Sequence, residues 1–483
     1  MARDGLSVIN AAAEPEVADL PAIFEEGKPI TYGQLGQRVE RRAADLAARG
    51  VGVGSRVTLR ATCEVETVVT FFALLELGAT FVPIHPRLTE AEEQTLIDDV
   101  VPDVGLSGPL VERLSTNRSH RHATDLELPA AIVYTSGTTG RPKGAVLSRG
   151  AFVASARASE ANLGWYSNDR WLVCMPLAHV GGLSILTRCL LARRAICLER
   201  RFDPDAVLRA IRRDAVTQMS VVPTMLDALL DADRDGSLAC LRFVLVGGAA
   251  ASPVLLERAA GRGLLALTTY GLTEACSQVT CQPLRLPGTT EPGSGRALAG
   301  IALRVMREDG GLAPAGEVGC IEIRGPNLMS GYFAGLDKPP TIPPTPDGWF
   351  GTGDLGALDE SGRLFVCARR TDLIVTGGEN VYPAEVEQVL EQAADVIGAV
   401  VFGVPDDRWG QIVAAAMVWK RNSLSDHERA MNVMVDVSRR LAPHKRPRLV
   451  AIVPALARTA SGKIDRATVC REAMPLLWNV SAR

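Results

Sequence analysis

Apolar positions follow helical spacing and strand spacing in alternation over most of the chain. Residues 37–50 form an amphipathic helical pattern that ends at Gly50, and its apolar face consists of Val39, Ala43, Leu46 and Ala47. Residues 66–84 predict a mostly buried helix that ends at Gly78 and is followed by a strand. A compact apolar run at residues 130–134 predicts another buried strand.

Residues 216–230 and 241–253 each predict a strand that leads directly into a helix, and the second of these strands opens into a Gly-Gly turn. Strands and helices that alternate in this way are typical of an α/β fold. After about residue 285 the pattern changes to short segments, and we expect β-hairpins around the turn signals at residues 307–311, 324–328 and 359–363.

Near residue 370 the alternation of strand and helix resumes. A strand at residues 373–375 leads through Gly377 and Gly378 into a helix that has Pro383 in its first turn. The buried side of this helix is predicted to consist of Val386, Val389, Leu390 and Ala393. We therefore expect a large domain over residues 1–369, built of layered α/β subdomains and a β-rich subdomain, and a small α+β domain over residues 370–483.

Composition narrows the classes of function. The 483 residues are 47% hydrophobic and 22% charged, with a net formal charge of −3, which gives no reason to expect nucleic acid as a partner. The ten cysteines are scattered singly, without a CxxC or a zinc-like Cys/His spacing, which favours a reducing compartment. No signal-peptide pattern or apolar run of membrane-spanning length is present, so we expect a cytoplasmic protein.

The segment YTSGTTGRPKG, residues 134–144, concentrates hydroxyls, glycines and one lysine directly after a predicted strand. Glycines allow the backbone to approach a ligand closely, the hydroxyls donate hydrogen bonds, and Lys143 adds positive charge, as a polyphosphate would require. Pro142 occupies the place of the second glycine of the common phosphate loop, so that pattern does not match. The plain alternative is a flexible surface turn.

Three later segments carry further candidate chemistry. Residues 268–275, TTYGLTEA, combine an aromatic ring that could stack on a base with a hydroxyl and with Glu274, a potential magnesium ligand. Residues 349–356, WFGTGDLG, present Asp354 in a Gly-rich turn, where a carboxylate could accept two ribose hydroxyls. Residues 459–466, TASGKIDR, offer Lys463. A capped strand end, an ordinary Asp turn and a solvated lysine are the plain readings of the three.

In this order the segments resemble the signature motifs of the adenylate-forming superfamily, which includes acyl- and aryl-CoA synthetases, luciferases and the adenylation domains of peptide synthetases. The matching motifs run from residue 134 to residue 466, and ITYGQL and ELGATFVPIHPRLT fit further upstream. The resemblance implies a two-step reaction. A carboxylate attacks the α-phosphorus of Mg-ATP to give an acyl-adenylate and pyrophosphate, and the thiol of coenzyme A then displaces AMP.

The resemblance also implies roles for individual residues. Glu274 would bind magnesium, Thr273 the α-phosphate, and Lys463 would stabilise charge during adenylation. The catalytic set would be Lys463, His179, Thr273 and Glu274. The ATP- and AMP-binding set would be Thr135, Ser136, Gly137, Thr138, Thr139, Gly140, Lys143, Gly248, Ala249, Tyr270, Gly271, Thr273, Asp354 and Arg369.

The same resemblance implies a C-terminal domain that rotates between the two half-reactions, so that residues 370–483 would be a mobile lid. Its hinge corresponds to Arg370, Thr371 and Asp372, and Gly377 and Gly378 would line the tunnel for the pantetheine arm of coenzyme A.

The acyl pocket of this superfamily begins around residues 174–191, and its predicted members are His179, Val180, Gly181, Arg188, Gly247 and Tyr270. The stretch HVGGLSILTR looks most like the o-succinylbenzoate-CoA ligases of menaquinone synthesis. There, Arg188 would suit an acid with a second carboxylate. Ala178 stands where that subgroup commonly has Phe, and residues 246–253 depart from its Gly-Gly-x-Pro pattern.

These departures leave several alternatives open. A ligase for benzoate, salicylate or anthranilate, feeding secondary metabolism, competes with the o-succinylbenzoate reading. A carrier-protein thiol could replace coenzyme A, and a homodimer is open as well. A silent acyl-adenylate-binding protein is the alternative outside enzymes, but such a protein would be expected to lack Lys463, Glu274 or Asp354, and all three are present.

Overall fold

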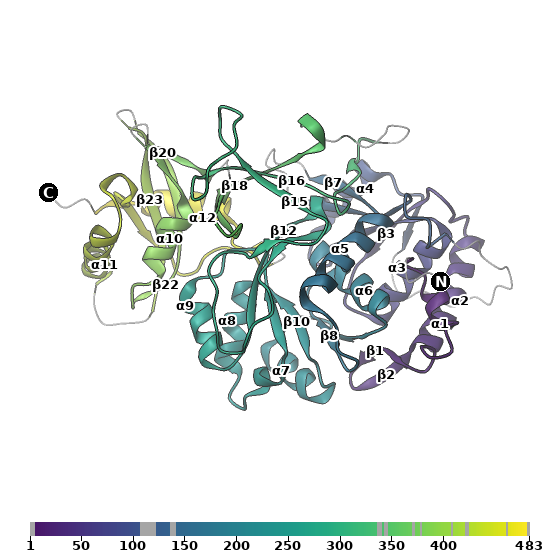
Figure 1. The fold of residues 1–483 in the computed structure, drawn as a ribbon. Coiled ribbons are helices and arrows are strands. Elements are labelled where there is room, and N and C mark those ends of the chain that lie inside the picture. The colour runs from purple at the N-terminus through teal and green to yellow at the C-terminus, as the bar shows by residue number, and fades with distance from the viewer. Residues whose placement is uncertain are drawn as a thin grey trace. The chain divides into compact units, whose positions relative to one another are not determined.

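The computed structural model describes residues 5–106, 122–135, 142–335, 341, 346–369, 372–376, 379–406, 409–420, 425–459 and 462–480. The chain divides into two compact units. The first contains residues 1–248, 255–303 and 323–350, and the second contains residues 249–254, 304–322 and 351–483. The elements are labelled in Figure 1.

A six-stranded sheet of the first unit has the order β17-β7-β6-β4-β3-β5. Its central strands β3, β4, β5 and β6 run parallel, and β7 and β17 are added antiparallel at one edge. The strands are β3 (Arg56–Arg60), β4 (Thr80–Ile84), β5 (Val104–Leu106), β6 (Pro129–Thr135), β7 (Lys143–Ser148) and β17 (Gly331–Tyr332).

A nine-stranded sheet of the same unit has the order β14-β13-β12-β11-β10-β8-β9-β1-β2. Its strands from β12 to β1 are parallel, whereas β2, β13 and β14 pair antiparallel. The strands are β1 (Pro21–Glu25), β2 (Lys28–Thr31), β8 (Arg170–Val173), β9 (Ala195–Leu198), β10 (Gln218–Val221), β11 (Phe243–Val246), β12 (Ala266–Leu272), β13 (Ser277–Cys281) and β14 (Arg296–Ala297).

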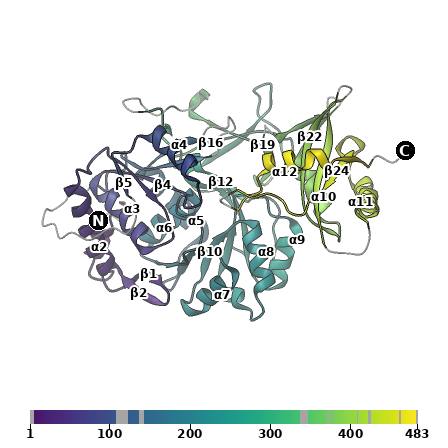
Figure 2. The same cartoon turned by 180° about the vertical axis from the view of Figure 1, so that it is seen from behind.

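Helices fill the space between and around these sheets. Helix α5 contacts β7 of one sheet and β13 of the other and packs on α6, so the pair α5–α6 is sandwiched between the two sheets (Figure 1). Helices α7 and α8 lie side by side on the nine-stranded sheet (Figure 2). The helices are α1 (Val8–Ala12), α2 (Tyr32–Ala48), α3 (Val65–Leu77), α4 (Glu90–Val100), α5 (Arg149–Leu163), α6 (Val180–Ala192), α7 (Pro204–Arg213), α8 (Pro223–Ala232) and α9 (Pro253–Gly261).

Helix α3 shows why the apolar pattern was informative. All of its residues except Glu66 are buried, and Gly78 ends it with a φ of 75°, a conformation that glycine adopts without strain. Helix α2 is more buried than its pattern predicts, because Arg42 and Asp45 are also covered. Arg42 pairs with Glu66, and Asp45 pairs with Arg49, so these buried charges have partners.

A four-stranded sheet has the order β15-β16-β18-β19, from β15 (Ala302–Met306), β16 (Gly319–Arg324), β18 (Phe350–Leu358) and β19 (Leu364–Arg369). The hairpin predicted around residues 359–363 is confirmed, because β18 and β19 pair antiparallel across that turn. The hairpin predicted around residues 324–328 is wrong. The chain after β16 forms β17, which pairs with the distant β7 instead of folding back onto β16.

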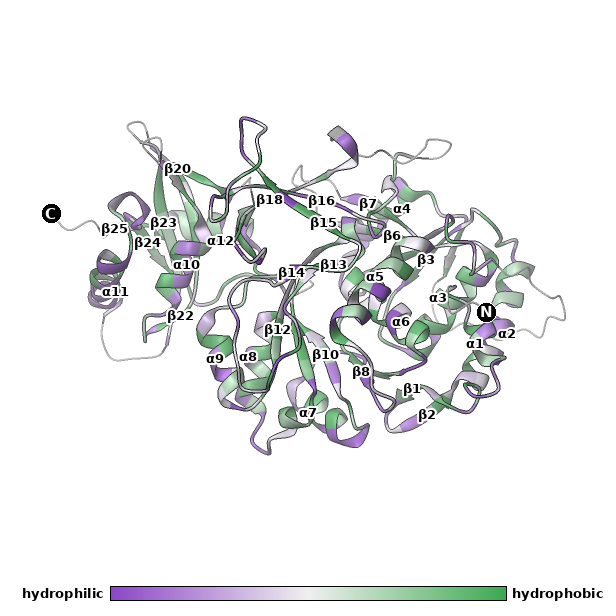
Figure 3. Cartoon of the chain, in the orientation of Figure 1, coloured by the Kyte–Doolittle hydropathy of each residue, from purple (hydrophilic) through white to green (hydrophobic). Residues whose placement is uncertain are grey.

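The second unit contains a further sheet of six strands, in which β21, β20, β23, β24 and β25 follow one another and β22 pairs with β23. The strands are β20 (Ile374–Thr376), β21 (Glu379–Val381), β22 (Val396–Asp406), β23 (Gly410–Trp419), β24 (Leu449–Ile452) and β25 (Trp478–Asn479). Figure 3 shows β23 as mostly apolar and α11 (Asp426–Arg440) as mostly polar, because α11 buries only one side on the sheet.

Helix α10 (Pro383–Glu391) begins at Pro383, as the sequence predicts, and buries Val386 and Leu390 fully. Val389 and Ala393 pack against the same core as partly buried residues. Helix α12 (Arg466–Ala473) begins at the N-cap Asp465, whose carboxylate accepts from the N–H of Thr468. The α/β fold class is confirmed, and the boundary of a mobile domain at residue 370 remains a prediction.

Candidate functional site

The donor-rich loop connects β6 and β7, two antiparallel neighbours in which Thr135 lies opposite Lys143. The Thr135 hydroxyl donates to the carbonyl of Lys143 over 3.4 Å, and this contact closes the base of the loop. A Cβ at Gly144 would come within 2.7 Å of an Ile132 methyl carbon, so a side chain does not fit there. The predicted loop residues Ser136, Gly137, Thr138, Thr139 and Gly140 lie outside the described residues.

The structure gathers three side chains of the first unit beside this loop. The Lys143 ammonium lies 5.4 Å from the centroid of the Tyr332 ring, and the Tyr332 hydroxyl donates to Glu274 Oε1 over 2.8 Å. Burial and the neighbouring Glu274 carboxylate raise the pKa of Tyr332, so the phenol stays protonated and remains a donor. The predicted phosphate-binding lysine and the predicted magnesium ligand are thus linked through one tyrosine.

Tyr332 was not predicted from the sequence. It belongs to β17, which forms only because the chain after residue 324 crosses to the edge of β7. Glu274 is fixed from the same segment, since its carbonyl accepts from the N–H of Met329. The proximity of Tyr332 to Lys143 depends on a strand pairing across almost two hundred residues, for which the local sequence gives no signal.

The predicted adenylate-binding segment lies at the end of β12. Tyr270 is half-buried and pairs with Thr280, and the register shifts between Tyr270 and Gly271. A Cβ at Gly271 would lie 1.8 Å from the carbonyl oxygen of Ser277, so only glycine fits at this position. The chain then turns through a short 3₁₀ helix, Thr273–Ala275, which presents Thr273 and Glu274 next to one another.

The Gly-Gly turn after β11 lies beside this segment, because β11 and β12 are parallel neighbours. A Cβ at Gly247 would approach the Thr269 methyl carbon to 2.9 Å, so the glycine permits close packing against β12. Gly248 has a φ of 78°, which favours glycine. Ala249 is exposed and falls in the second unit.

The predicted acyl-pocket segment begins helix α6. His179 is its N-cap residue, and its carbonyl accepts from the N–H groups of Gly182 and Leu183. A Cβ at Gly182 would lie 2.8 Å from the carbonyl oxygen of Pro176, so this turn requires a residue without a side chain. At Gly181 the nearest atom to such a Cβ is the Met175 methyl carbon at 3.4 Å, and Val180 is buried.

Arg188 lies on the same helix and is only 3% exposed. It donates to the Ser277 hydroxyl over 3.2 Å, and its guanidinium lies 5.6 Å from the centroid of the Trp171 ring. Its Nε is buried and has no hydrogen-bond partner within the described part of the chain. Burial lowers the pKa of Arg188 to about 10, which shows how poorly the surroundings solvate this charge.

The second unit holds the predicted ribose-binding residues. Asp354 on β18 lies opposite Arg369 on β19, so the sheet places the two predicted residues as direct neighbours. The N–H of Asp354 donates to the Thr352 hydroxyl, and that hydroxyl donates to the carbonyl of Ile321. The side chain of Arg369 lies outside what the structure describes.

Lys463, also in the second unit, is exposed on a tight turn. Its carbonyl accepts from both the N–H and the hydroxyl of Thr459, and Gly462 has a φ of 84°. Of the predicted hinge and tunnel residues, Arg370, Thr371, Gly377 and Gly378 lie outside the described residues. Asp372 is described, and its carboxylate lies 3.6 Å from Arg466 Nε.

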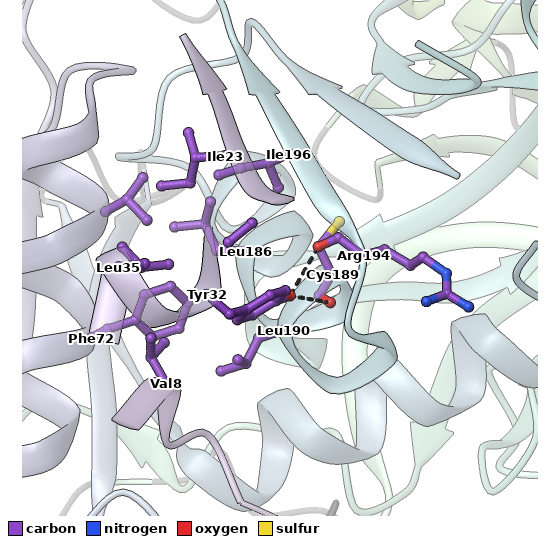
Figure 4. Close-up of a pocket in the computed structure, with 12 residues that line it drawn as sticks. Val8, Ile23, Tyr32, Leu35, Phe72, Leu186, Cys189, Leu190, Arg194 and Ile196 are labelled. Carbon is purple, nitrogen blue, oxygen red and sulfur yellow. Dashed lines mark hydrogen bonds between the residues drawn. The ribbon is translucent and has the colours of Figure 1, made fainter. Parts of the chain in front are cut away.

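A small cavity of the first unit belongs to a different region (Figure 4). It is mostly apolar, and the Tyr32 hydroxyl at its wall donates to the carbonyls of Cys189 and Arg194. Its volume is about 20 Å³, roughly enough for one water molecule. None of the predicted site residues lines this cavity, and an aryl acid does not fit in it.

The described residues contain neither a cluster of metal-ligating side chains nor a membrane-spanning helix. Among the described residues, no group of three or more His, Cys, Asp or Glu side chains is arranged to hold a metal ion. Within the same part of the chain, no helix is both long and apolar enough to cross a membrane.

Comparison with known proteins identifies the family. The model for AMP-binding enzymes matches residues 10–125 and 108–333, and the model for the AMP-binding enzyme C-terminal domain matches residues 385–463. A 2-succinylbenzoate–CoA ligase of Bacillus cereus (strain Q1) is 36% identical over 468 residues, which cover 93% of this chain and 95% of the relative. A 2-succinylbenzoate–CoA ligase of Listeria monocytogenes is 34% identical and covers 92% and 95%.

Solved structures agree with the sequence relatives. The o-succinylbenzoate CoA synthetase (MenE) of Bacillus subtilis, in complex with the acyl-adenylate intermediate OSB-AMP, aligns with a TM-score of 0.86 and 30% identity over 96% of this chain and 98% of that one. The ATP-bound MatB of Rhodopseudomonas palustris aligns with a TM-score of 0.85 and 29% identity over 97% and 98%. The predicted resemblance is confirmed: the chain belongs to the AMP-binding enzyme family, the adenylate-forming enzymes.

Proposed function

We propose that this chain is an ATP-dependent aryl-acid CoA ligase of the o-succinylbenzoate type, which forms an acyl-adenylate and then an acyl-CoA thioester. The observation that carries the proposal is the contact of Tyr332 with both Lys143 and Glu274 at the mouth of the donor-rich loop. A cation and a carboxylate held together at a glycine-rich loop match what a magnesium–nucleotide complex needs. The relatives named as 2-succinylbenzoate–CoA ligases over nearly the full chain support the choice of acid.

The first step would be in-line attack of the substrate carboxylate on the α-phosphorus of ATP, with pyrophosphate as the leaving group. Little covalent help from the protein is needed, so the side chains would act by placement and by charge. Lys143 and the hydroxyl-rich loop would bind the β- and γ-phosphates, and Thr273 would bind the α-phosphate. Magnesium, held by Glu274, would supply neutralisation of phosphate charge when it is bound.

The remaining assignments concern the nucleoside and the second step. Tyr270 would stack on adenine, Asp354 would bind the ribose hydroxyls, and Arg369 would reach the ribose or a phosphate. The opposite positions of Asp354 and Arg369 on β18 and β19 support placing both at the nucleotide. In the second step the thiol of coenzyme A would attack the acyl carbon, and the bond to AMP would break. Gly377 and Gly378 would line the path of its pantetheine arm.

Arg188 is proposed to bind the second carboxylate of the acid. Its guanidinium is buried on α6, nine residues after His179, and a carboxylate would accept from the Nε–H that the described residues leave without a partner. His179 and Val180 at the start of the same helix would contact the acid near the reacting carboxylate. An aryl acid with a single carboxylate would leave Arg188 without its partner.

The movement of the C-terminal residues is proposed on the same grounds. Residues 370–483 would rotate between the half-reactions about Arg370, Thr371 and Asp372, bringing Lys463 in for adenylation only. Asp372 pairs with Arg466, and Arg466 also donates to Glu387, so this member of the hinge is tied to α10 and α12 of its own unit. Coenzyme A is the proposed acceptor, and a carrier-protein thiol is the competing one.

Location and assembly complete the proposal. All ten cysteines are free, and burial raises the pKa of the Cys63 thiol to about 12, so this cysteine behaves as an inert buried residue. Free cysteines are compatible with a reducing compartment, and we propose the cytoplasm. Assembly into a homodimer remains a prediction.

The direct test is pyrophosphate release with ATP, magnesium and coenzyme A across o-succinylbenzoate, benzoate, salicylate, anthranilate, octanoate and several amino acids. A response to o-succinylbenzoate well above the others would support the proposal. A preference for a monocarboxylic aryl acid would keep the two-step reaction but reject the proposed substrate. Absence of release with every acid would reject the ligase activity itself.

Lys463→Ala tests the proposed role of that lysine. We expect adenylate formation to lose about 2–4 kcal/mol of transition-state stabilisation, because a charge-stabilising group is removed. Thioester formation from supplied acyl-adenylate should be spared. Lys445→Ala is a matched control in the same unit, since Lys445 pairs with Glu385 near the surface and has no proposed role in the reaction. Equal loss in both half-reactions would contradict the assignment.

A further inference from the structure

His85 lies at the edge of the six-stranded sheet where the donor-rich loop begins. It follows β4 directly, and β4 runs parallel to β6 with Phe81 opposite Ala131. His85 is the first residue after the carboxyl end of β4, and the parallel β6 ends at Thr135, the first residue of the loop. Ligands of open α/β sheets bind at the carboxyl ends of parallel strands, and His85 occupies that edge.

The ring of His85 also faces the predicted acyl pocket. Its centroid lies 5.1 Å from the centroid of the His179 ring, with an angle of 45° between the ring planes. His85 is 8% exposed, and His85, His179 and Thr135 all belong to the first unit. The buried imidazole of His85 therefore lies at the strand end that carries the predicted phosphate loop, and beside His179 of the predicted acyl pocket.

The hydrogen bonding of His85 determines its tautomer. The N–H of Arg87 donates to His85 Nδ1 over 3.1 Å, so Nδ1 carries no proton. Burial, together with the nearby Arg87, lowers the pKa of His85, which keeps the ring neutral at pH 7. In the neutral ring with an unprotonated Nδ1, the proton resides on Nε2, and Nε2 is a donor.

This donor is left open by the protein. Nε2 of His85 is buried and has no hydrogen-bond partner among the residues that the structure describes. A buried N–H without an acceptor is unfavourable, and an open donor in a native structure calls for an explanation. A bound ligand that supplies an acceptor would provide one, at the edge where a ligand is expected.

We propose that His85 is a further ligand-binding residue of this enzyme, whose Nε2–H donates to an anionic oxygen of the bound substrates. That oxygen belongs either to the carboxylate of the acid, beside His179, or to a phosphate of ATP, beside Thr135. The proposal rests on the proposed ligase function. The alternative is that His85 only packs against His179 and against the turn at Arg87.

Two substitutions separate the two nitrogen atoms of the ring. His85→Asn keeps an amide oxygen near the position of Nδ1, where it can accept from the N–H of Arg87, but has no donor at the position of Nε2. His85→Gln places its amide NH₂ near the position of Nε2. The local turn should therefore survive in the first variant, and the ligand contact should survive in the second.

We expect His85→Asn to raise the KM for one ligand about ten- to a hundredfold, the effect of losing a hydrogen bond to a charged oxygen. His85→Gln should keep both KM values within a few-fold of those of the unmodified enzyme, and His85→Asn, which retains the acceptor for the N–H of Arg87, should unfold at nearly the same temperature as that enzyme. A rise in the KM for the acid identifies the carboxylate as the acceptor, and a rise in the KM for ATP identifies the phosphate. Unchanged KM values in His85→Asn, or an equal loss in both variants, would overturn the proposal.

A second readout does not depend on turnover. The protein has six histidines, so the Nε2–H signal of His85 in ¹⁵N-labelled protein can be assigned by its loss in His85→Asn. Adding o-succinylbenzoate, or ATP with magnesium, should shift this signal downfield and slow its exchange with water. A signal that responds to neither ligand overturns the proposal. Failure of the acid panel together with an ATP-dependent shift would reject the proposed acid substrates and retain the contact of His85 with ATP.

Discussion

Two arginines on the sandwiched helices α5 and α6 are buried in different ways. Arg149 donates to three backbone carbonyls, those of Pro129 at 2.8 Å, Leu75 at 3.2 Å and Ala79 at 3.4 Å. Within the described residues, Arg188 donates to one hydroxyl, that of Ser277, and lies near the face of the Trp171 ring. The Nε atoms of both arginines are buried without a partner among those residues, so the two differ in the contacts of their terminal nitrogens. Burial lowers the pKa of both arginines to about 10.

The contacts of the two arginines indicate which of the two buried charges stabilises the fold. A buried cation that donates to carbonyls of several elements ties those elements together, and its removal leaves the carbonyls without donors. A buried cation whose terminal nitrogens have a single hydroxyl as partner has a desolvation cost that few contacts offset, and such poorly paired charges are typical of ligand-binding sites. Arg149 is accordingly a residue of the core, and Arg188 is a candidate contact for substrate.

The largest expected effect is on stability. Arg149→Met should lower the free energy of unfolding by about 3–5 kcal/mol, because the carbonyls of Pro129, Leu75 and Ala79 lose the guanidinium as a donor and Leu75 keeps only the N–H of Gly78. Urea unfolding measures the loss, and the KM values of the surviving folded enzyme should not change. Wild-type stability in this variant would show that the carbonyls find other donors and would remove the contrast with Arg188.

The same substitution at Arg188 should act on the substrate and leave the fold intact. Arg188→Met should leave the free energy of unfolding unchanged or raise it, because a poorly solvated charge is replaced by an apolar side chain. The transition-state stabilisation given by kcat/KM should fall by about 2–3 kcal/mol for o-succinylbenzoate. The kcat/KM for benzoate should change little. Ser277→Ala is the control that removes only the hydroxyl partner. Equal losses for both acids would make Arg188 structural.

The smallest expected effect extends the comparison to two acids on α10. Glu387 accepts from the N–H of Val401 and from Arg466, whereas Glu391 accepts only a 3.4 Å contact from the N–H of Ala399 among the described residues. Burial raises the pKa of Glu391 to about 7. Because the folded state then holds a proton that the unfolded state has lost, this group makes stability fall as the pH rises from about 4.5 to 7.

Glu391→Gln should therefore stabilise the protein at pH 8, by an amount on the order of 2 kcal/mol, and have little effect at pH 4.5. Calorimetric unfolding at the two pH values measures this difference. Glu387→Gln is the control and should destabilise, because it weakens the pairing with Arg466. A stability difference between Glu391→Gln and the unmodified chain that does not depend on pH would contradict the linkage.

Local sequence patterns were sufficient for much of the fold. The buried helix α3 and its glycine terminus, the start of α10 at Pro383, and the two strand–helix units at β10 and β11 follow from periodicity and from the few residues that begin or end helices. These features depend on neighbours within about ten residues, which is the range that periodicity reports. The order of the motifs also identified the family.

The sequence by itself determined the α/β elements, the candidate side chains and the class of reaction that they would serve. Only the tertiary structure decided which of them meet. Tyr332 reaches Glu274 through the pairing of β17 with β7, and His85 reaches His179 across parallel strands and a helix terminus. The physical reason is that pairing between distant strands and the satisfaction of buried donors depend on the whole packed unit, and no local pattern records either one.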